Sequence, residues 1–151
     1  MCPYLGACLD FSEKDLKSEY FANTRHLHLD AYNLYYGNII EQSLEYAKEH
    51  NLSVSLDICS PELIQSHRDK LMNILETGLI TVIFCNSAES EAFSGKSNIK
   101  ALDFLSNFCE IAVIMLGEKG ALLKHQTEYL HQHSYKVDPF DTTGAGDVFI
   151  G

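Results

Sequence analysis

The sequence is short of basic side chains. It contains 11 lysines and arginines against 21 aspartates and glutamates, which gives a formal net charge of −10 at pH 7. Nucleic-acid backbones reward clustered lysine and arginine, so this deficit argues against a nucleic-acid partner. An anionic substrate would have to be held by local backbone amides or a metal ion, because the overall field of the protein repels anions.

Paired cysteines and long apolar runs are also missing. The five cysteines are scattered and no Cys-x-x-Cys spacing occurs, which argues against a zinc ribbon or a redox pair and favours a reducing compartment. No apolar run approaches the roughly 20 residues of a membrane span. No basic stretch followed by a long apolar core begins the sequence. We therefore expect a cytoplasmic location and no membrane partner.

The 151 residues are 46% hydrophobic and 21% charged, which is typical of one globular domain or a piece of one. The pattern predicts strands over 25–29, 52–56, 79–85, 111–116 and 121–124, and two weaker strands near 127–131 and 134–138. It predicts helices over 13–20, 39–49, 61–76, 87–93 and 99–108. The apolar runs at 79–85 and 111–116 are typical of a parallel sheet that is covered on both faces. Strands that alternate with helices predict an α/β fold with an open, mostly parallel sheet and helices on both faces.

The most informative motif closes the sequence: Asp141-Thr142-Thr143-Gly144-Ala145-Gly146-Asp147. Its small residues let a backbone approach an anion closely, and their order suits a loop that leads into a helix with free amides. Phosphoryl transfer builds negative charge that such amides can meet. Asp147 would sit where a carboxylate can take a proton from a hydroxyl. An ordinary glycine turn with a capping aspartate is the alternative.

Two further motifs each follow a predicted buried strand. Asn86-Ser87-Ala88-Glu89 follows the strand over 79–85, and Leu116-Gly117-Glu118-Lys119-Gly120-Ala121 follows the strand over 111–116. Ligands bind open α/β sheets beyond such strand ends. Each motif also has a purely structural interpretation, because Asn86 with Glu89 can form a helix capping box and Gly117 with Gly120 can form a hairpin turn.

Other polar residues give weaker signals. Asp57 ends a predicted strand at the same edge of the sheet, where a turn residue is the simpler interpretation. The histidines His26 and His28 share a strand face, as do His131 and His133. No cysteine or acidic residue completes a recognisable ligand spacing, which favours structural or exposed histidines over a zinc site.

Together, the three motifs resemble those of the PfkB carbohydrate kinases, in the ribokinase-like superfamily. The segment 141–147 is similar to the second signature of that family, 86–89 to its Asn-x-x-Glu motif, and 116–121 to its Leu-Gly-x-x-Gly turn. Their order and approximate spacing match over nearly the whole chain. The stretches 4–7 and 28–32 more weakly resemble the adenosine-kinase-like branch.

The resemblance implies roles for the closing motif. Asp147 would be the base that deprotonates the acceptor hydroxyl. Three small residues would form the anion hole for the transferring phosphoryl group: Gly144, Ala145 and Gly146. Asp141 and Thr143 match positions that hold a monovalent cation such as K⁺ in many members of the family.

The resemblance also implies a nucleotide site that takes ATP and Mg²⁺. Asn86 and Glu89 would act near Mg²⁺ and the phosphates, with Glu89 acting through water, as suits the reluctance of magnesium to lose its water shell. Gly117 and Gly120 would let the nucleotide lie close to the backbone. Met115 departs from the threonine that is frequent in the family, which puts one nucleotide contact in doubt.

Parts of the family's kinase domain have no counterpart in the sequence. The lid, the N-terminal acceptor-binding residues and the C-terminal part of the ATP site are missing. We therefore expect 1–151 to be a partial kinase domain, inactive by itself, from an enzyme that moves the γ-phosphate of ATP to a hydroxyl of a sugar or nucleoside. The resemblance allows a homodimer of the full-length protein. A catalytically silent module that binds a nucleotide or sugar for regulation is the alternative.

Overall fold

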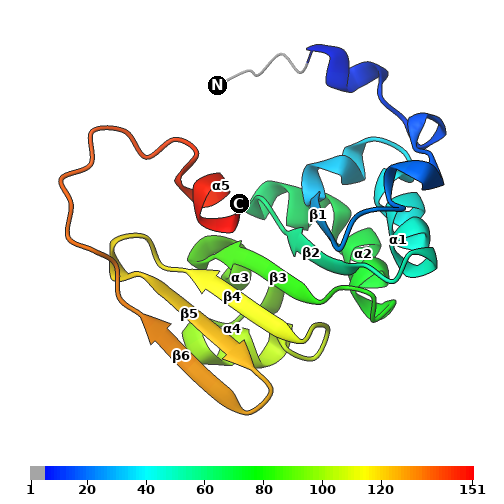
Figure 1. Ribbon diagram of the computed structural model, residues 1–151. Helices are drawn as coiled ribbons and strands as arrows, with labels where there is room; N and C mark the ends of the chain where they lie inside the picture. The colour runs from blue at the N-terminus through cyan, green and yellow to red at the C-terminus, as the bar shows by residue number, and fades with distance from the viewer. Residues whose placement is uncertain (1–5) are drawn as a thin grey trace.

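A computed structural model describes residues 6–151 of the chain (Figure 1). Tyr4 and Leu5 of the weaker resemblance, and the side chains of Cys2 and Cys8, lie outside the described residues. The fold is built around one six-stranded sheet, whose strands lie side by side in the order of the sequence. The strands are β1 (His26–Asp30), β2 (Ser53–Asp57), β3 (Val82–Asn86), β4 (Ile111–Met115), β5 (Ala121–His125) and β6 (Glu128–Gln132).

The first four strands pair in parallel, and the last two extend the sheet as an antiparallel hairpin. The helices are α1 (Ile39–Glu49), α2 (Pro61–Glu76), α3 (Ser87–Ser94), α4 (Asn98–Leu105) and α5 (Ala145–Ile150). Short 3₁₀ turns occupy Gly6–Asp10, Glu13–Asp15, Ser18–Tyr20, Ala31–Tyr35 and Gly117–Lys119. No helix within 6–151 is long and apolar enough to cross a membrane.

The core lies between the sheet and α1–α4. Right-handed crossovers between neighbouring parallel strands place the connecting helices on the same face of the sheet. Alternate strand residues point to that face and are almost fully buried, among them Leu56, Ile83 and Ile114. The opposite face is contacted at the end of β4 by α5, whose Gly146 lies beside Met115. The open, mostly parallel sheet with helices on both faces, predicted from the sequence, is therefore confirmed.

Two predicted elements were wrong. The helix expected over 13–20 is replaced by two 3₁₀ turns, because the backbone is extended at Leu16 and Lys17. Ser12 and Asp15 form a capping box, which starts a turn but does not propagate into a helix. The strand expected over 134–138 is irregular and exposed, since β6 already forms the edge of the sheet and the segment pairs with no strand.

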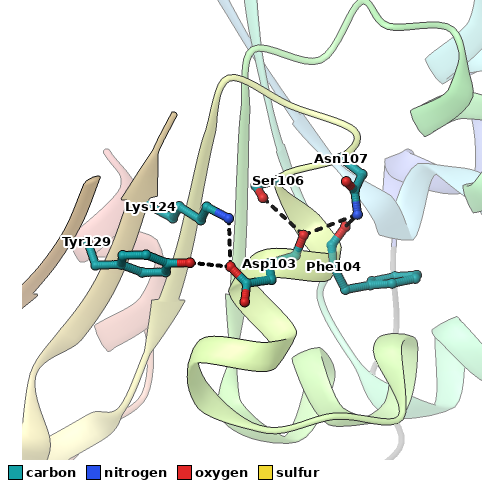
Figure 2. A network of polar contacts seen from close by, with 6 residues as sticks. All are labelled: Asp103, Phe104, Ser106, Asn107, Lys124 and Tyr129. Atoms are coloured by element: carbon teal, nitrogen blue, oxygen red, sulfur yellow. Dashed lines mark hydrogen bonds and ion pairs between the residues drawn. The ribbon is translucent and has the colours of Figure 1, made fainter. Parts of the chain in front are cut away.

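Polar contacts tie the hairpin to the helical layer (Figure 2). The Lys124 ammonium of β5 donates a hydrogen bond of 2.6 Å to Asp103 Oδ1 of α4. The Tyr129 hydroxyl of β6 donates to the same oxygen. The Lys124 ammonium also lies 5.1 Å from the centroid of the Tyr129 ring. These contacts hold the pKa of Asp103 below its usual value, chiefly through the Lys124 hydrogen bond. The hairpin that precedes the closing motif is thus fixed to α4.

The predicted histidine pairs have different surroundings. The His26 ring bonds to the hydroxyls of Ser53 and Ser55, at 2.7 and 2.8 Å, and His28 bonds to Ser55 at 2.8 Å. The rings of His131 and His133 lie 4.2 Å apart between centroids. Within 6–151, no group of three or more histidine, cysteine or acidic residues is arranged to hold a metal ion directly.

Candidate active site

The candidate site lies at the carboxyl edge of the parallel strands. Asp30, Asp57, Asn86 and Met115 are the last residues of β1 to β4. Asp30 is the register partner of Asp57, and Asn86 is the register partner of Met115. Because parallel strands end at the same edge, the motifs that follow β3 and β4 are brought together there. Figure 1 shows α5, in red, above this same edge after a long excursion of the chain from β6.

Asn86 and Glu89 form a closed polar pair at the start of α3. The Asn86 side chain accepts from the Glu89 backbone N–H at 3.0 Å, and the Glu89 carboxylate accepts from the Asn86 backbone N–H at 2.7 Å. A further bond of 2.6 Å joins the Asn86 amide to Glu89 Oε1. The structural alternative considered for this motif, a capping box, is therefore present.

Glu89 is more deeply buried than a capping role requires. Only 4% of the residue is exposed. Burial raises the pKa of Glu89 to about 7, against an ordinary value of 4.5, and its bonds with Asn86 offset only part of that rise. A carboxyl group whose pKa is raised this far by burial at the edge of a sheet is typical of a functional site. A nearby cation would stabilise the ionised form of Glu89, so the chemistry of this side chain fits a role beside Mg²⁺.

The structure adds Asp57 to this edge. Its carboxylate accepts from the Cys59 backbone N–H at 3.2 Å, and the Cys59 thiol donates to Asp30 at 2.9 Å. Burial raises the pKa of Asp57, and the charges of Asp30 and Asp147 raise it further. Asp147 therefore lies within electrostatic range of Asp57, although the two are 90 positions apart in the sequence.

The closing motif folds as a loop that leads into a helix, as predicted. Gly144 adopts the left-handed conformation (φ 74°) directly before α5, and it has no side chain to cap the helix. Ala145 donates its backbone N–H to Thr142 at 3.1 Å. The Asp147 carboxylate turns back over the loop, with Oδ2 3.6 Å from the position that a Cβ of Gly144 would occupy. The carboxylate and the glycine backbone thus face the same space.

Asp141 and Thr143 meet in the same loop. The Thr143 backbone N–H donates to Asp141 Oδ1 at 2.8 Å. This bond, followed by the Thr143 hydroxyl, lowers the pKa of Asp141, so the carboxylate stays ionised through the neutral range. An ionised, exposed carboxylate beside a hydroxyl is a suitable pair of oxygen donors for a cation.

Gly117 and Gly120 differ in what the fold demands of them. Both have positive φ, of 61° and 93°. Nothing lies within 4 Å of a Cβ placed at Gly117, so the space beside this residue is open to a ligand. At Gly120 a Cβ would collide with the backbone at the end of β6. The hairpin interpretation of the turn therefore accounts for Gly120, whereas Gly117 keeps open space beside it.

Comparison with known proteins agrees with this arrangement of motifs. The sequence profile of pfkB family carbohydrate kinases matches residues 1–151. The chain belongs to the pfkB family. Ribokinase of Staphylococcus aureus (strain COL) is 32% identical to the PfkB chain over an alignment of 119 residues, which covers 74% of this chain and 36% of that enzyme. Family members of this kind are sugar or nucleoside kinases.

Solved structures share the fold of the PfkB chain. Adenosine kinase of Sinorhizobium meliloti superposes with a TM-score of 0.89 at 22% identity, covering 97% of this chain and 46% of that one. An Escherichia coli protein in complex with ATP and Mg²⁺ superposes with a TM-score of 0.83 at 22% identity, covering 95% and 48%. The chain thus spans about a third to a half of the length of these relatives.

The burial of Glu89 predicts a pH dependence for the stability of the PfkB chain. Above pH 4.5 the carboxyl is ionised in the unfolded chain, whereas the folded chain keeps its proton up to about pH 7. The free energy of unfolding should therefore fall as pH rises through this window, by up to about 3 kcal/mol from this group, and level off above it.

The substitution Glu89→Gln removes this titration and keeps an acceptor for the Asn86 N–H. The stability difference between Glu89→Gln and the unsubstituted chain should grow by about 3 kcal/mol in favour of glutamine between pH 4.5 and pH 7, as measured by urea unfolding. Glu91→Gln, on the exposed side of the same helix, is the control and should show no such trend. If the free energies of unfolding of the Glu89→Gln variant and the unsubstituted chain change in parallel with pH, Glu89 does not have a raised pKa.

Proposed function

We propose that residues 1–151 form the central part of an ATP-dependent kinase, which moves the γ-phosphoryl group of ATP to a hydroxyl of a sugar or nucleoside. The proposal is carried by the meeting of three separate motifs at one edge of the sheet. Their residues are Asn86 and Glu89, Gly117 and Gly120, and the loop from Asp141 to Asp147. Membership of the pfkB family supports the reaction type.

The side chains and backbone groups divide the reaction between them. Asp147 accepts the proton of the acceptor hydroxyl while the hydroxyl oxygen forms a bond to the γ-phosphorus. The bond between the γ-phosphorus and its bridging oxygen breaks, and ADP leaves. Negative charge on the γ-phosphoryl oxygens would be met by backbone amides of the loop of Gly144, Ala145 and Gly146. The Ala145 N–H would first have to leave the Thr142 carbonyl, to which it donates at 3.1 Å.

The cofactors that we propose are ATP and Mg²⁺, with K⁺ as the monovalent cation. When bound, Mg²⁺ neutralises charge on the phosphate oxygens. Glu89 would hold it through water, and Asn86 fixes the orientation of the Glu89 carboxylate. Asp141 and Thr143 would supply oxygens to hold K⁺. The solved relative in complex with ATP and Mg²⁺ supports the choice of ATP and Mg²⁺ as cofactors.

We propose that the kinase activity belongs to a longer protein. The chain covers 36% of S. aureus ribokinase and 46% of the S. meliloti adenosine kinase structure. A kinase also needs groups that bind the acceptor and enclose the nucleotide, and we assign these groups to the rest of the longer protein. We propose that the complete protein is a cytoplasmic kinase and that residues 1–151 alone transfer no phosphate.

A substrate panel on the complete protein tests the proposal. The flanking coding sequence defines the protein to be expressed. Ribose, adenosine and fructose are the first acceptors to try, because the relatives include kinases named for them. We expect ADP release that depends on both Mg²⁺ and one acceptor. Calorimetric binding of ATP with Mg²⁺, together with no transfer to any acceptor, would favour the silent regulatory module instead.

A further inference from the structure

Met115 stands where the three motifs meet. It is the last residue of β4, directly before the Leu116–Gly120 turn, and its register partner on β3 is Asn86. Its Cε methyl lies 3.9 Å from the position that a Cβ of Gly146 would occupy, which places the side chain against the first turn of α5. One half-buried side chain therefore adjoins all three segments of the proposed site.

The helix α5 has few other supports. It is six residues long, and helices this short are not stable without packing. Two of its apolar side chains give it little anchorage, because Val148 is 82% exposed and Phe149 is 52% exposed, and Ile150 at its end is only half-buried. The Met115 contact is thus well placed to decide how close the loop of Gly144 to Asp147 stands to the end of β4. A flexible thioether suits this position, since methionine adapts to irregular gaps.

We infer that Met115 is a positioning residue, which holds the anion-hole loop and Asp147 at their working distance from the Asn86–Glu89 pair. This inference rests on the proposed kinase function. It assigns Met115 no contact with the reacting atoms. Its side chain acts through the backbone of Gly146, by filling the space between that backbone and the sheet.

Truncation of Met115 in the complete kinase tests the inference. Met115→Ala should lower kcat about 10-fold through misplacement of the loop, while KM for ATP stays within about threefold. Met115→Leu, which keeps the volume, should recover most of the loss. Met72→Ala is the matched control, because Met72 is also half-buried but packs in α2 on the other side of the sheet. It should leave kcat unchanged.

Hydrogen exchange gives a readout that does not depend on catalysis. Amides 144–150 should exchange faster in Met115→Ala, and at the unsubstituted rate in both Met72→Ala and Met115→Leu. If the unsubstituted kinase transfers no phosphate, the proposed function is wrong. In that case the exchange rates by themselves would decide whether Met115 positions the loop. Unchanged exchange in Met115→Ala, or a higher kcat or tighter ATP binding in that variant, would overturn the inference, since the side chain would then be idle or obstructive.

Discussion

Replacing Asp147 by asparagine in the complete kinase should lower kcat by about 10³-fold, within the range that general-base catalysis supplies. Asparagine has nearly the same shape but cannot take the proton of the acceptor hydroxyl. The side chain is exposed at the start of α5 and bears no core contact, so the fold should not change. Steady-state ADP release measures the loss, and calorimetry should find the affinity for ATP with Mg²⁺ within about threefold of the unsubstituted value.

Asp138→Asn is the control for this substitution. Asp138 is an exposed acid in the same irregular segment that leads to α5, and it lies outside the motif. It should retain the unsubstituted kcat. Full turnover by Asp147→Asn would contradict the role of Asp147 as the base.

The second large effect is expected at Gly120, and it concerns stability. A Cβ atom at this position would lie 1.9 Å from the backbone oxygen of Gln132 and 2.8 Å from the backbone nitrogen of Ser134. The backbone also has φ 93° and ψ −134°, which residues with a side chain rarely adopt. Gly120→Ala should therefore lower the free energy of unfolding by roughly 3 kcal/mol or more, since strain and collision add.

Gly78→Ala separates these two causes. Gly78 has φ 69°, and nothing lies within 4 Å of the added Cβ, so only the conformational cost of about 1 kcal/mol remains. Urea unfolding of both variants measures the difference. If Gly120→Ala proves no less stable than Gly78→Ala, the close packing of the turn against the end of β6 is incorrect.

Sequence patterns located much of the fold because local and long-range signals agree in it. Helices were predicted over 39–49 and 61–76, and these are the bounds of α1 and α2 in the structure. Ser60 does cap α2, with its hydroxyl accepting from the Leu63 N–H at 3.2 Å. Where only a local signal existed, as at Ser12, a turn formed without a helix, because no apolar face followed that could be buried.

The burial of the site residues could not be predicted from the sequence. Asn86 and Glu89 have the spacing of a capping box, and that spacing is the same whether the carboxylate is exposed or buried. The position of Asp57 at a predicted strand end is a sequence signal for the site, but a simple turn residue has the same signal. Its proximity to Asp147 depends on the path of 133–144, which brings α5 back to the edge of the sheet. The sequence pattern predicted a strand at 134–138 instead of this irregular path.

The central claim is that the three motifs form one phosphoryl-transfer centre. A crystal structure of the complete kinase with Mg²⁺ and a non-hydrolysable ATP analogue tests this claim most directly. We predict that the γ-phosphate lies within hydrogen-bond distance, about 3 Å, of backbone amides in the loop from Gly144 to Gly146, with Mg²⁺ bridged to Glu89 by water. A γ-phosphate bound elsewhere on the sheet, away from α5, would contradict the account.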